Sequence, residues 1–218
     1  MFDRCRSGVS LLAFLLSVSG VGVAQAAAHS EWVGTWATSP MLAENTFRIY
    51  DFSGKTLREI VHVSAGGEQV RIRFTNEFGK DPLVLSDVHV AMSAGADAIK
   101  DGTDHALTFG GEKTVRVAAG AVAYSDPVTM TVAPMSDLTV SFFVPSQVMR
   151  QETFHDFADQ DNYLVSGDVA GAASLTDAKK IESWYFLDGV DVAGTKGARA
   201  IVTLGDSITD GALSTRNA

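Results

Sequence analysis

A serine near the end of the sequence stands where a fold could present a nucleophile. The run from Ala200 to Leu204 is apolar throughout, which is typical of a strand buried on both faces, as in a parallel sheet. The run stops at Gly205-Asp206-Ser207, and Gly211 follows. A strand that ends in a Gly-flanked turn can present a hydroxyl at the carboxyl edge of an open α/β sheet, where such folds place their sites. Ser207 is therefore a candidate nucleophile, which would need a neighbouring base to accept its proton.

The block GDSITDG, from Gly205 to Gly211, resembles the first sequence block of the SGNH hydrolases, also called GDSL esterases and lipases. The β-rich region before it is similar to the N-terminal domain of some exported bacterial members. The block differs from the G-x-S-x-G elbow of α/β-hydrolases, because Asp206 directly precedes the serine and residue 209 is not glycine. The resemblance implies a carboxylic ester hydrolase (an esterase, a lipase or a carbohydrate deacetylase) with a flavodoxin-like hydrolase domain and no cofactor.

The resemblance also implies roles for individual residues. Ser207 is the nucleophile and its backbone N–H is an oxyanion-hole donor, in a turn shaped by Gly205, Asp206 and Gly211. In the family, the other oxyanion donors and the catalytic histidine, oriented by an aspartate, come from later blocks. Eleven residues follow Ser207 here, and none of them is histidine. The expectation is a hydrolase sequence truncated just after its first block and inactive as it stands.

Structural roles are the alternative for the same residues. Ser207 could be a turn residue or a helix cap, although its context favours the nucleophile. Asp206 is expected to shape the turn through side-chain hydrogen bonds to the backbone. Thr209 and Asp210 are candidate caps of a following helix.

The preceding region has histidines that could supply the missing base: His29, His62, His89, His105 and His155. His155 is the best candidate because Asp156 and aromatic residues flank it, but packing or surface roles are favoured for all of them. Their spacing is not that of paired zinc ligands. The acidic stretch 156–162 could bind calcium, but it lacks EF-hand spacing, and a solvated acidic loop is favoured. No metal site is predicted.

From Trp32 to about Val192 the sequence shows a dominant hydrophobic period of two, which is typical of antiparallel strands with one buried and one wet face. The β-domain is expected to span residues 29–190. Turn residues separate the apolar runs at Gly66-Gly67, Asn76 to Pro82, Gly110-Gly111, Gly120 and Pro134. The pattern predicts a mainly β protein with a jelly-roll-like antiparallel β-sandwich. The best helical candidate in this region is the short segment Leu175–Lys180.

The alternating positions define the predicted core. They are Val63 with Ile60 or Val61, then Val70, Ile72, Phe74, Val115, Val117, Val128, Met130, Val132, Leu138, Val140, Phe142 and Val144. Aromatic residues expected to add to this core are Trp32, Trp36, Phe74, Phe142, Phe143, Trp184 and Phe186. Trp184 and Tyr185 could instead stack on sugars, but a core role is favoured.

The two ends of the sandwich are predicted from composition. Residues 191–198, DVAGTKGA, resemble a linker in being small and Gly-containing, so that 199–218 begin a hydrolase domain. Residues 1–26 have the features of a secretory signal: Arg4 and Arg6, an apolar run and a small-x-small site ending at Ala26. The apolar run is too short for a good membrane anchor, which needs about 20 apolar residues. A secreted or periplasmic protein, cleaved near Ala26, is therefore expected.

Composition narrows the choice of partners. The net charge of −9 argues against nucleic acid, whose phosphates would be repelled. The single cysteine, Cys5, excludes a disulfide framework. A small-molecule ester or an acetylated polysaccharide is the expected substrate.

Two other functional interpretations stay open. The sandwich could be a non-catalytic carbohydrate-binding module, by analogy with other jelly rolls. Alternatively, the chain could be a fragment without function, in which an unpaired strand at 200–204 predicts poor solubility or clipping near residue 195.

Overall fold

The structure is a computed structural model that describes residues 31–43, 50–195, 197–199 and 201–217. The predicted signal sequence at 1–26 and the candidate His29 lie outside these residues. Within them, no helix has the length and apolar character needed to cross a bilayer.

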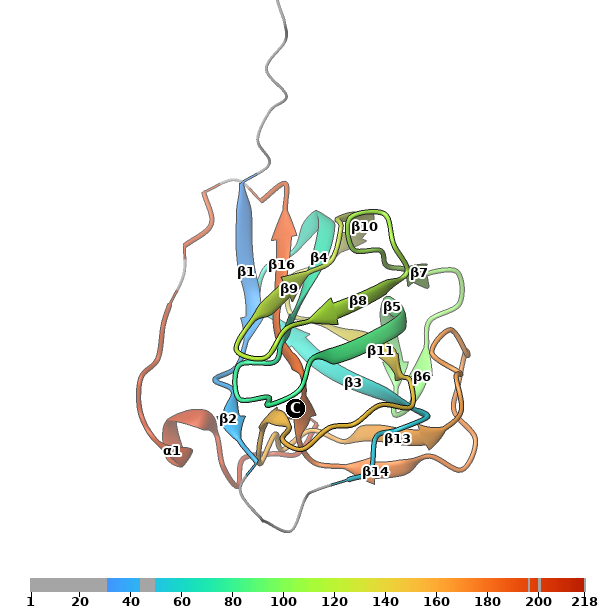
Figure 1. Ribbon diagram of the computed structural model, residues 1–218. Coiled ribbons are helices and arrows are strands. Elements are labelled where there is room, and N and C mark those ends of the chain that lie inside the picture. The colour runs from blue at the N-terminus through green and yellow to red at the C-terminus, as the bar shows by residue number, and fades with distance from the viewer. Residues whose placement is uncertain (1–30, 44–49, 196, 200, 218) are drawn as a thin grey trace, which may run out of the picture.

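The described residues form a mainly β structure in which two antiparallel sheets pack face to face (Figure 1). The first sheet has the order β1-β16-β4-β10, and β9 also pairs with β4. Its strands are β1 (Trp32–Ala37), β16 (Leu187–Ala193), β4 (Gly67–Thr75), β10 (Val128–Val132) and β9 (Val122–Tyr124).

The second sheet has the order β14-β13-β3-β11-β5-β6, and β7 and β8 also pair with β5. Its strands are β14 (Lys179–Ile181), β13 (Asn162–Ser166), β3 (Lys55–Val63), β11 (Ser136–Val144), β5 (Leu83–Gly95), β6 (Ala98–Ile99), β7 (His105–Ala106) and β8 (Thr114–Val117).

A small third sheet carries the surface on which the C-terminal segment lies. Its order is β15-β12-β2, and its strands are β15 (Trp184–Tyr185), β12 (Thr153–His155) and β2 (Met41–Leu42). The short helix α1 (Ser207–Asp210) lies near β2 in Figure 1.

The core lies between the two large sheets, where the predicted alternation places it. Val70, Ile72 and Phe74 of β4 are fully buried, as are Val140 and Phe142 of β11. The rings of Phe74 and Phe142 meet edge to face with their centroids 5.1 Å apart, so they join the two sheets directly. The predicted core positions of these two strands are therefore confirmed, although loops and neighbouring strands also bury Thr139 and Ser141 on the outer face of β11.

Three sequence-based expectations within the sandwich were wrong. Trp32 lies outside the core, because it packs on the Arg71 guanidinium at 4.5 Å, on the outer face of the first sheet. Phe143 is only half-buried and points away from the core, because it alternates with Phe142. The segment Leu175–Lys180 forms no helix, and its last two residues begin β14.

The first sheet extends beyond the boundary expected at residue 190. Strand β16 continues to Ala193 and pairs with both β1 and β4, so Asp191–Ala193 belong to the sheet and not to a linker. Asp191 looks like a loop residue in the sequence, but its carboxylate accepts a hydrogen bond of 2.8 Å from Arg71 Nε on the neighbouring strand. This ion pair explains a charged residue in the middle of a sheet.

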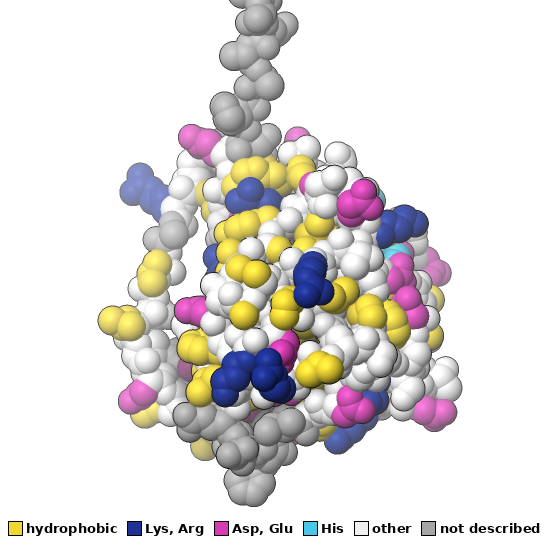
Figure 2. Space-filling view, in the orientation of Figure 1, with side chains coloured by type: hydrophobic (Ala, Val, Ile, Leu, Met, Phe, Trp, Pro, Cys, Tyr) yellow, Lys and Arg dark blue, Asp and Glu magenta, His cyan; other side chains and the backbone are white. Residues whose placement is uncertain are grey.

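The apolar segment before the serine forms no strand among the described residues 201–204. Its side chains are almost fully exposed: 93% for Ile201, 88% for Val202 and 99% for Leu204. The segment runs outside β1 and returns to the body at α1, separated from the body by a visible gap (Figures 1 and 2). The predicted buried strand is absent here because a strand needs a neighbour for its N–H and C=O groups.

Candidate functional site

The Gly-Asp-Ser turn is a capped helix start. Asp206 has an extended backbone and is the N-cap of α1, and its Oδ1 accepts a hydrogen bond of 3.2 Å from the Ile208 N–H. Its carbonyl accepts the first helical bond, from the Asp210 N–H at 3.0 Å. The expectation that Asp206 shapes the turn through the backbone is confirmed. Thr209 and Asp210, the candidate caps of a following helix, both lie inside α1, so their capping of a later helix stays a prediction.

Two glycines of the motif have specific local functions. A Cβ atom on Gly205 would overlap the side chain of Thr209, so glycine lets the helix fold back over the turn. Gly211 ends α1 with φ at +96°, the left-handed conformation that glycine adopts without strain. The spacing of the motif therefore matches a single, tightly closed turn of helix.

Ser207 is the first residue of α1 and is exposed to solvent. Among the described residues, neither its hydroxyl nor its backbone N–H has a hydrogen-bond partner. In the described part of the chain no base contacts the hydroxyl, so Ser207 is an exposed serine with no activating group beside it there.

His155, the best sequence candidate for a base, lies beside this helix but contacts a different residue. Its Nε2 lies 2.9 Å from Asp210 Oδ2, and its Nδ1 lies 2.8 Å from the carbonyl oxygen of Ser39. The ring also packs against Trp184, with the ring centroids 5.8 Å apart. The structure thus brings His155 to the motif, where it pairs with Asp210.

A second contact attaches the end of the segment to the sandwich. Asp161 is 7% exposed, and its carboxylate accepts hydrogen bonds from Lys180 Nζ and Arg216 Nε, both at 2.7 Å, and from Asn217 Nδ2 at 3.2 Å. The Asn217 amide also accepts from the Asp161 N–H at 2.6 Å. Burial disfavours the ionised carboxylate, but these donors outweigh it and lower the pKa of Asp161 to about 2.

The acidic stretch 156–162 is therefore not a solvated loop throughout. Asp161 is buried and neutralised by cations of the chain itself, and Asp156 accepts a hydrogen bond of 3.0 Å from Ser183 Oγ. Within the described residues, no group of three or more His, Cys, Asp or Glu side chains is arranged to hold a metal ion.

Two other candidate histidines pair with aspartates far from the serine in sequence. His62 Nδ1 lies 2.7 Å from Asp137 across β3 and β11. His89 lies 2.8 Å from Asp104 through Nδ1 and 3.3 Å from Asp87 through Nε2. Among the described residues neither contacts α1, and both lie on the surface of the sandwich.

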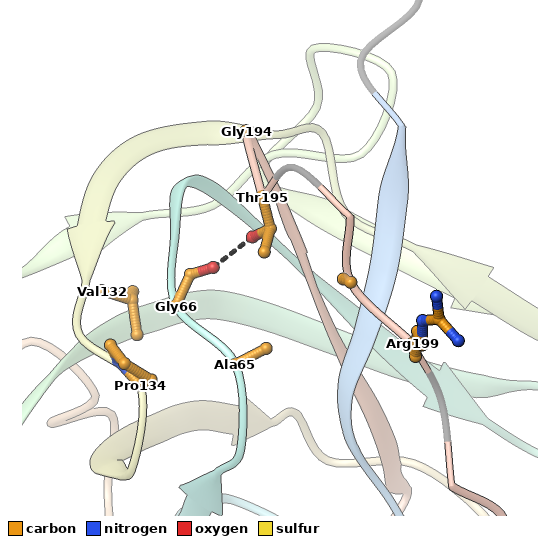
Figure 3. A pocket seen from close by; sticks show the side chains of 8 residues that line it. Ala65, Gly66, Val132, Pro134, Gly194, Thr195 and Arg199 are labelled. Carbon is orange, nitrogen blue, oxygen red and sulfur yellow. Dashed lines mark hydrogen bonds between the residues drawn. The ribbon is translucent and has the colours of Figure 1, made fainter.

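An open hollow of about 570 Å³ lies at the end of the sandwich where the chain leaves β16. The Thr195 hydroxyl donates a hydrogen bond to the Gly66 carbonyl there (Figure 3). None of the predicted site residues lines it. The lining residues are Ala65, Gly66, Val132, Pro134, Gly194, Thr195, Ala198 and Arg199.

The aromatic pair considered for sugar stacking belongs to the core. Tyr185 is fully buried, and Trp184 is partly buried with its Nε1 donating to the Ile60 carbonyl at 2.9 Å. Trp184 also meets Trp36 edge to face, with centroids 5.1 Å apart. The preferred core interpretation of these two residues is confirmed.

Sequence reasoning missed most of the contacts that place the motif. Asp210, Arg216, Asn217 and Asp161 were not recognised as partners, because they are brought together from positions about 55 residues apart. The sequence feature that pointed to one of these contacts was His155, which is followed by Asp156 and has aromatic residues beside it. No protein-family model matches the chain, and no curated protein matches it significantly. The motif and its geometry are therefore what bears on function.

Proposed function

We propose that this chain carries the nucleophile block of an exported SGNH-type carboxylic ester hydrolase, with Ser207 as the nucleophile. The proposed architecture is a jelly-roll-type sandwich followed by the start of the hydrolase domain, in the secreted or periplasmic space. The observation that carries the proposal is the capped turn. Asp206 and Gly211 close one helical turn that leaves Ser207 exposed at its first position. The resemblance of GDSITDG to the first family block points the same way.

The chemistry would be acyl transfer to Ser207. The serine oxygen attacks the ester carbonyl while a base accepts its proton, and the alcohol leaves as the acyl-enzyme forms. An N–H in the first turn of a helix has no intrahelical acceptor, so the Ser207 N–H is suited to the oxyanion. Within the ranges that the structure describes, no activating base contacts Ser207, and the eleven residues that follow it in the sequence include no histidine. We therefore expect the chain by itself to be inactive toward esters.

The first step of the test is to sequence the gene past codon 218 in all three frames. The sequence is searched for the later family blocks, which would supply an oxyanion-hole glycine, an oxyanion-hole asparagine and an Asp-x-x-His. The product carrying such blocks is then assayed with p-nitrophenyl acetate and acetylated xylan. Ser207→Ala should abolish hydrolysis, whereas Ser214→Ala, an exposed serine in the same segment, should leave it unchanged. Hydrolysis that survives Ser207→Ala would refute the proposal. The carbohydrate-binding alternative gains nothing from Trp184 and Tyr185, since both pack in the core.

A further inference from the structure

The C-terminal segment is attached to the sandwich by polar contacts and not by apolar packing. Helix α1 has no buried residue, and Ile208 beside the serine is 85% exposed. The segment nevertheless returns to the body at two places: Asp210 meets His155, and Arg216 with Asn217 meets Asp161. The position of the Gly-Asp-Ser turn on the sandwich therefore depends on these two anchors.

We infer that the sandwich surface around His155 and Asp161 is a docking surface for the segment 206–217, and that His155 is a positioning residue whose own proton holds α1 in place. That the docked segment is a nucleophile turn rests on the proposed function. The docking itself does not depend on it.

The hydrogen-bond geometry of His155 fixes where its protons must be. A carbonyl oxygen can only accept, so Nδ1 must donate to Ser39 O at 2.8 Å. The neutral ring carries one N–H, so it can donate to Ser39 or to Asp210 but not to both. Both contacts are hydrogen bonds at the same time only if the ring holds a second proton and is an imidazolium. The bond of 2.9 Å is an ion pair that exists while His155 is protonated.

The surroundings of His155 offer no substitute for that proton. The β1–β2 connection contributes the Ser39 carbonyl, and β15 contributes the uncharged Trp184 ring. The charged group that meets the ring among the described residues is Asp210 of α1. The adjacent carboxylate, Asp156, accepts from Ser183 Oγ. Loss of one ring proton would end the ion pair with Asp210 and leave one of the two ring nitrogens without a hydrogen to donate.

The second anchor does not titrate in the same range. The pKa of Asp161 is about 2, because its donors outweigh the effect of burial, so this carboxylate stays ionised far below the histidine range. Arg216 and Lys180 stay charged throughout. The segment should therefore remain tethered at Asn217, while the docking of α1 weakens when the His155–Asp210 ion pair is lost.

The test is heteronuclear NMR on the full 218-residue chain at about pH 5.5 and about pH 8.5, on either side of ordinary histidine titration near about 6.5. The ring nitrogen shifts report the His155 proton, and the backbone amides of 208–212 report the order of α1. Exposed ion pairs are weak, so we expect the docked population of α1 to change roughly two- to fivefold between the two pH values.

Three variants separate this mechanism from a merely structural role. His155→Gln retains a donor that does not titrate, so α1 should stay docked at both pH values. His155→Ala should release it at both. Arg216→Gln weakens the other anchor and should leave the pH dependence of α1 intact, while amides of the core strand β11 report that the sandwich is folded in every variant.

An order of α1 that is independent of pH in the natural chain would overturn the inference, as would a pH dependence that survives His155→Ala. The measurement uses no ester and does not require Ser207. A failed docking result therefore leaves the hydrolase proposal standing, and a failed esterase result leaves the docking result standing.

Discussion

Arg58 and Glu59 are neighbours in β3, are both fully buried, and direct their charged groups to opposite faces of the second sheet. The Arg58 guanidinium donates to Ser141 Oγ and to three backbone carbonyls, of Asp97, Ala170 and Ala172, on the outer face. Glu59 lies on the core side with Leu57 and Val61, as the period of two requires. The two charges therefore do not neutralise each other, and each has its own environment.

Glu59 should make the stability of the sandwich fall as the pH rises. Burial raises the pKa of Glu59 well above 4.5, although the Tyr185 N–H donates to its Oε1 at 2.6 Å. Its Oε2 has no hydrogen-bond partner among the described residues. Between the unfolded value of 4.5 and the raised folded value, the folded state holds a proton that the unfolded state has lost. Stability is then lost with rising pH, by at most about 1.4 kcal/mol per pH unit.

The measurement is urea unfolding from about pH 5 to about pH 8, a window above the ordinary glutamate pKa of about 4.3. Glu59→Gln should remove the downward slope that Glu59 contributes, whereas Glu68→Gln, at an exposed position on β4, should keep it. Equal slopes in the natural chain and in Glu59→Gln would show that Glu59 is not the group responsible.

Arg58 should be hard to replace, even by lysine. Its planar guanidinium donates hydrogen bonds to four oxygen atoms, at distances of 2.6 to 3.0 Å. These bonds hold the 167–178 loop and the β5–β6 turn against the outer face of β3. An ammonium group cannot reach all of these oxygens, so Arg58→Lys should lower the free energy of unfolding by about 1–3 kcal/mol. Arg116→Lys, at an exposed position on β8, is the matched control. Equal urea midpoints for the two variants would contradict this prediction.

The sequence predicted the fold best where a strand has one wet face. The apolar positions of β4 and β10 could be identified because exposed or half-buried polar residues alternate with them. In β11 the alternating residues Thr139 and Ser141 are polar although they are buried, so the pattern could still be seen. The same rule was weaker for β3, where loops cover the outer face and bury Thr56, Arg58 and Ile60 as well. Burial on both faces removes the contrast that alternation depends on.

The candidate site was predictable only in its local part. Gly205, Asp206, Ser207 and Gly211 are close in sequence, so the capped turn follows from their own conformational preferences. The contacts of His155 with Asp210 and of Asp161 with Arg216 depend on the path of the whole chain, and no local pattern encodes them.

The inter-sheet contact of Phe142 should be among the largest single contributions to stability. Its ring is fully buried and meets Phe74 at 5.1 Å between the sheets. Phe142→Ala should destabilise the protein by about 3–5 kcal/mol, because the rigid sheets cannot close the cavity. Phe143→Ala, one residue along on the opposite face and only half-buried, should cost clearly less in the same urea titration. A larger loss for Phe143→Ala would mean that the register of β11 is wrong.

The exposed apolar segment between the sandwich and α1 should be the first part of the chain to be cut. Ile201, Val202 and Leu204 are 93%, 88% and 99% exposed, and residues 201–204 belong to no strand, so a protease that prefers apolar residues can bind this backbone directly. We expect thermolysin to cleave there before it cleaves the sandwich. Mass spectrometry should find a fragment that retains β16. This fragment should have the same unfolding transition as the uncut chain.

The same segment should limit solubility, since three apolar side chains on unpaired backbone can pair with a second copy of the chain. The double variant Val202→Ser, Leu204→Ser should raise the concentration at which light scattering first appears. Met135→Ser, which removes another exposed apolar side chain on the turn between β10 and β11, controls for general surface polarity. If thermolysin cut first within β3 or β11, the segment would not be the most accessible cleavage site. If Met135→Ser raised the concentration at which scattering appears as much as the double variant does, the segment would not be what limits solubility. The extended chain before Ser207 would then be protected by a contact of its own.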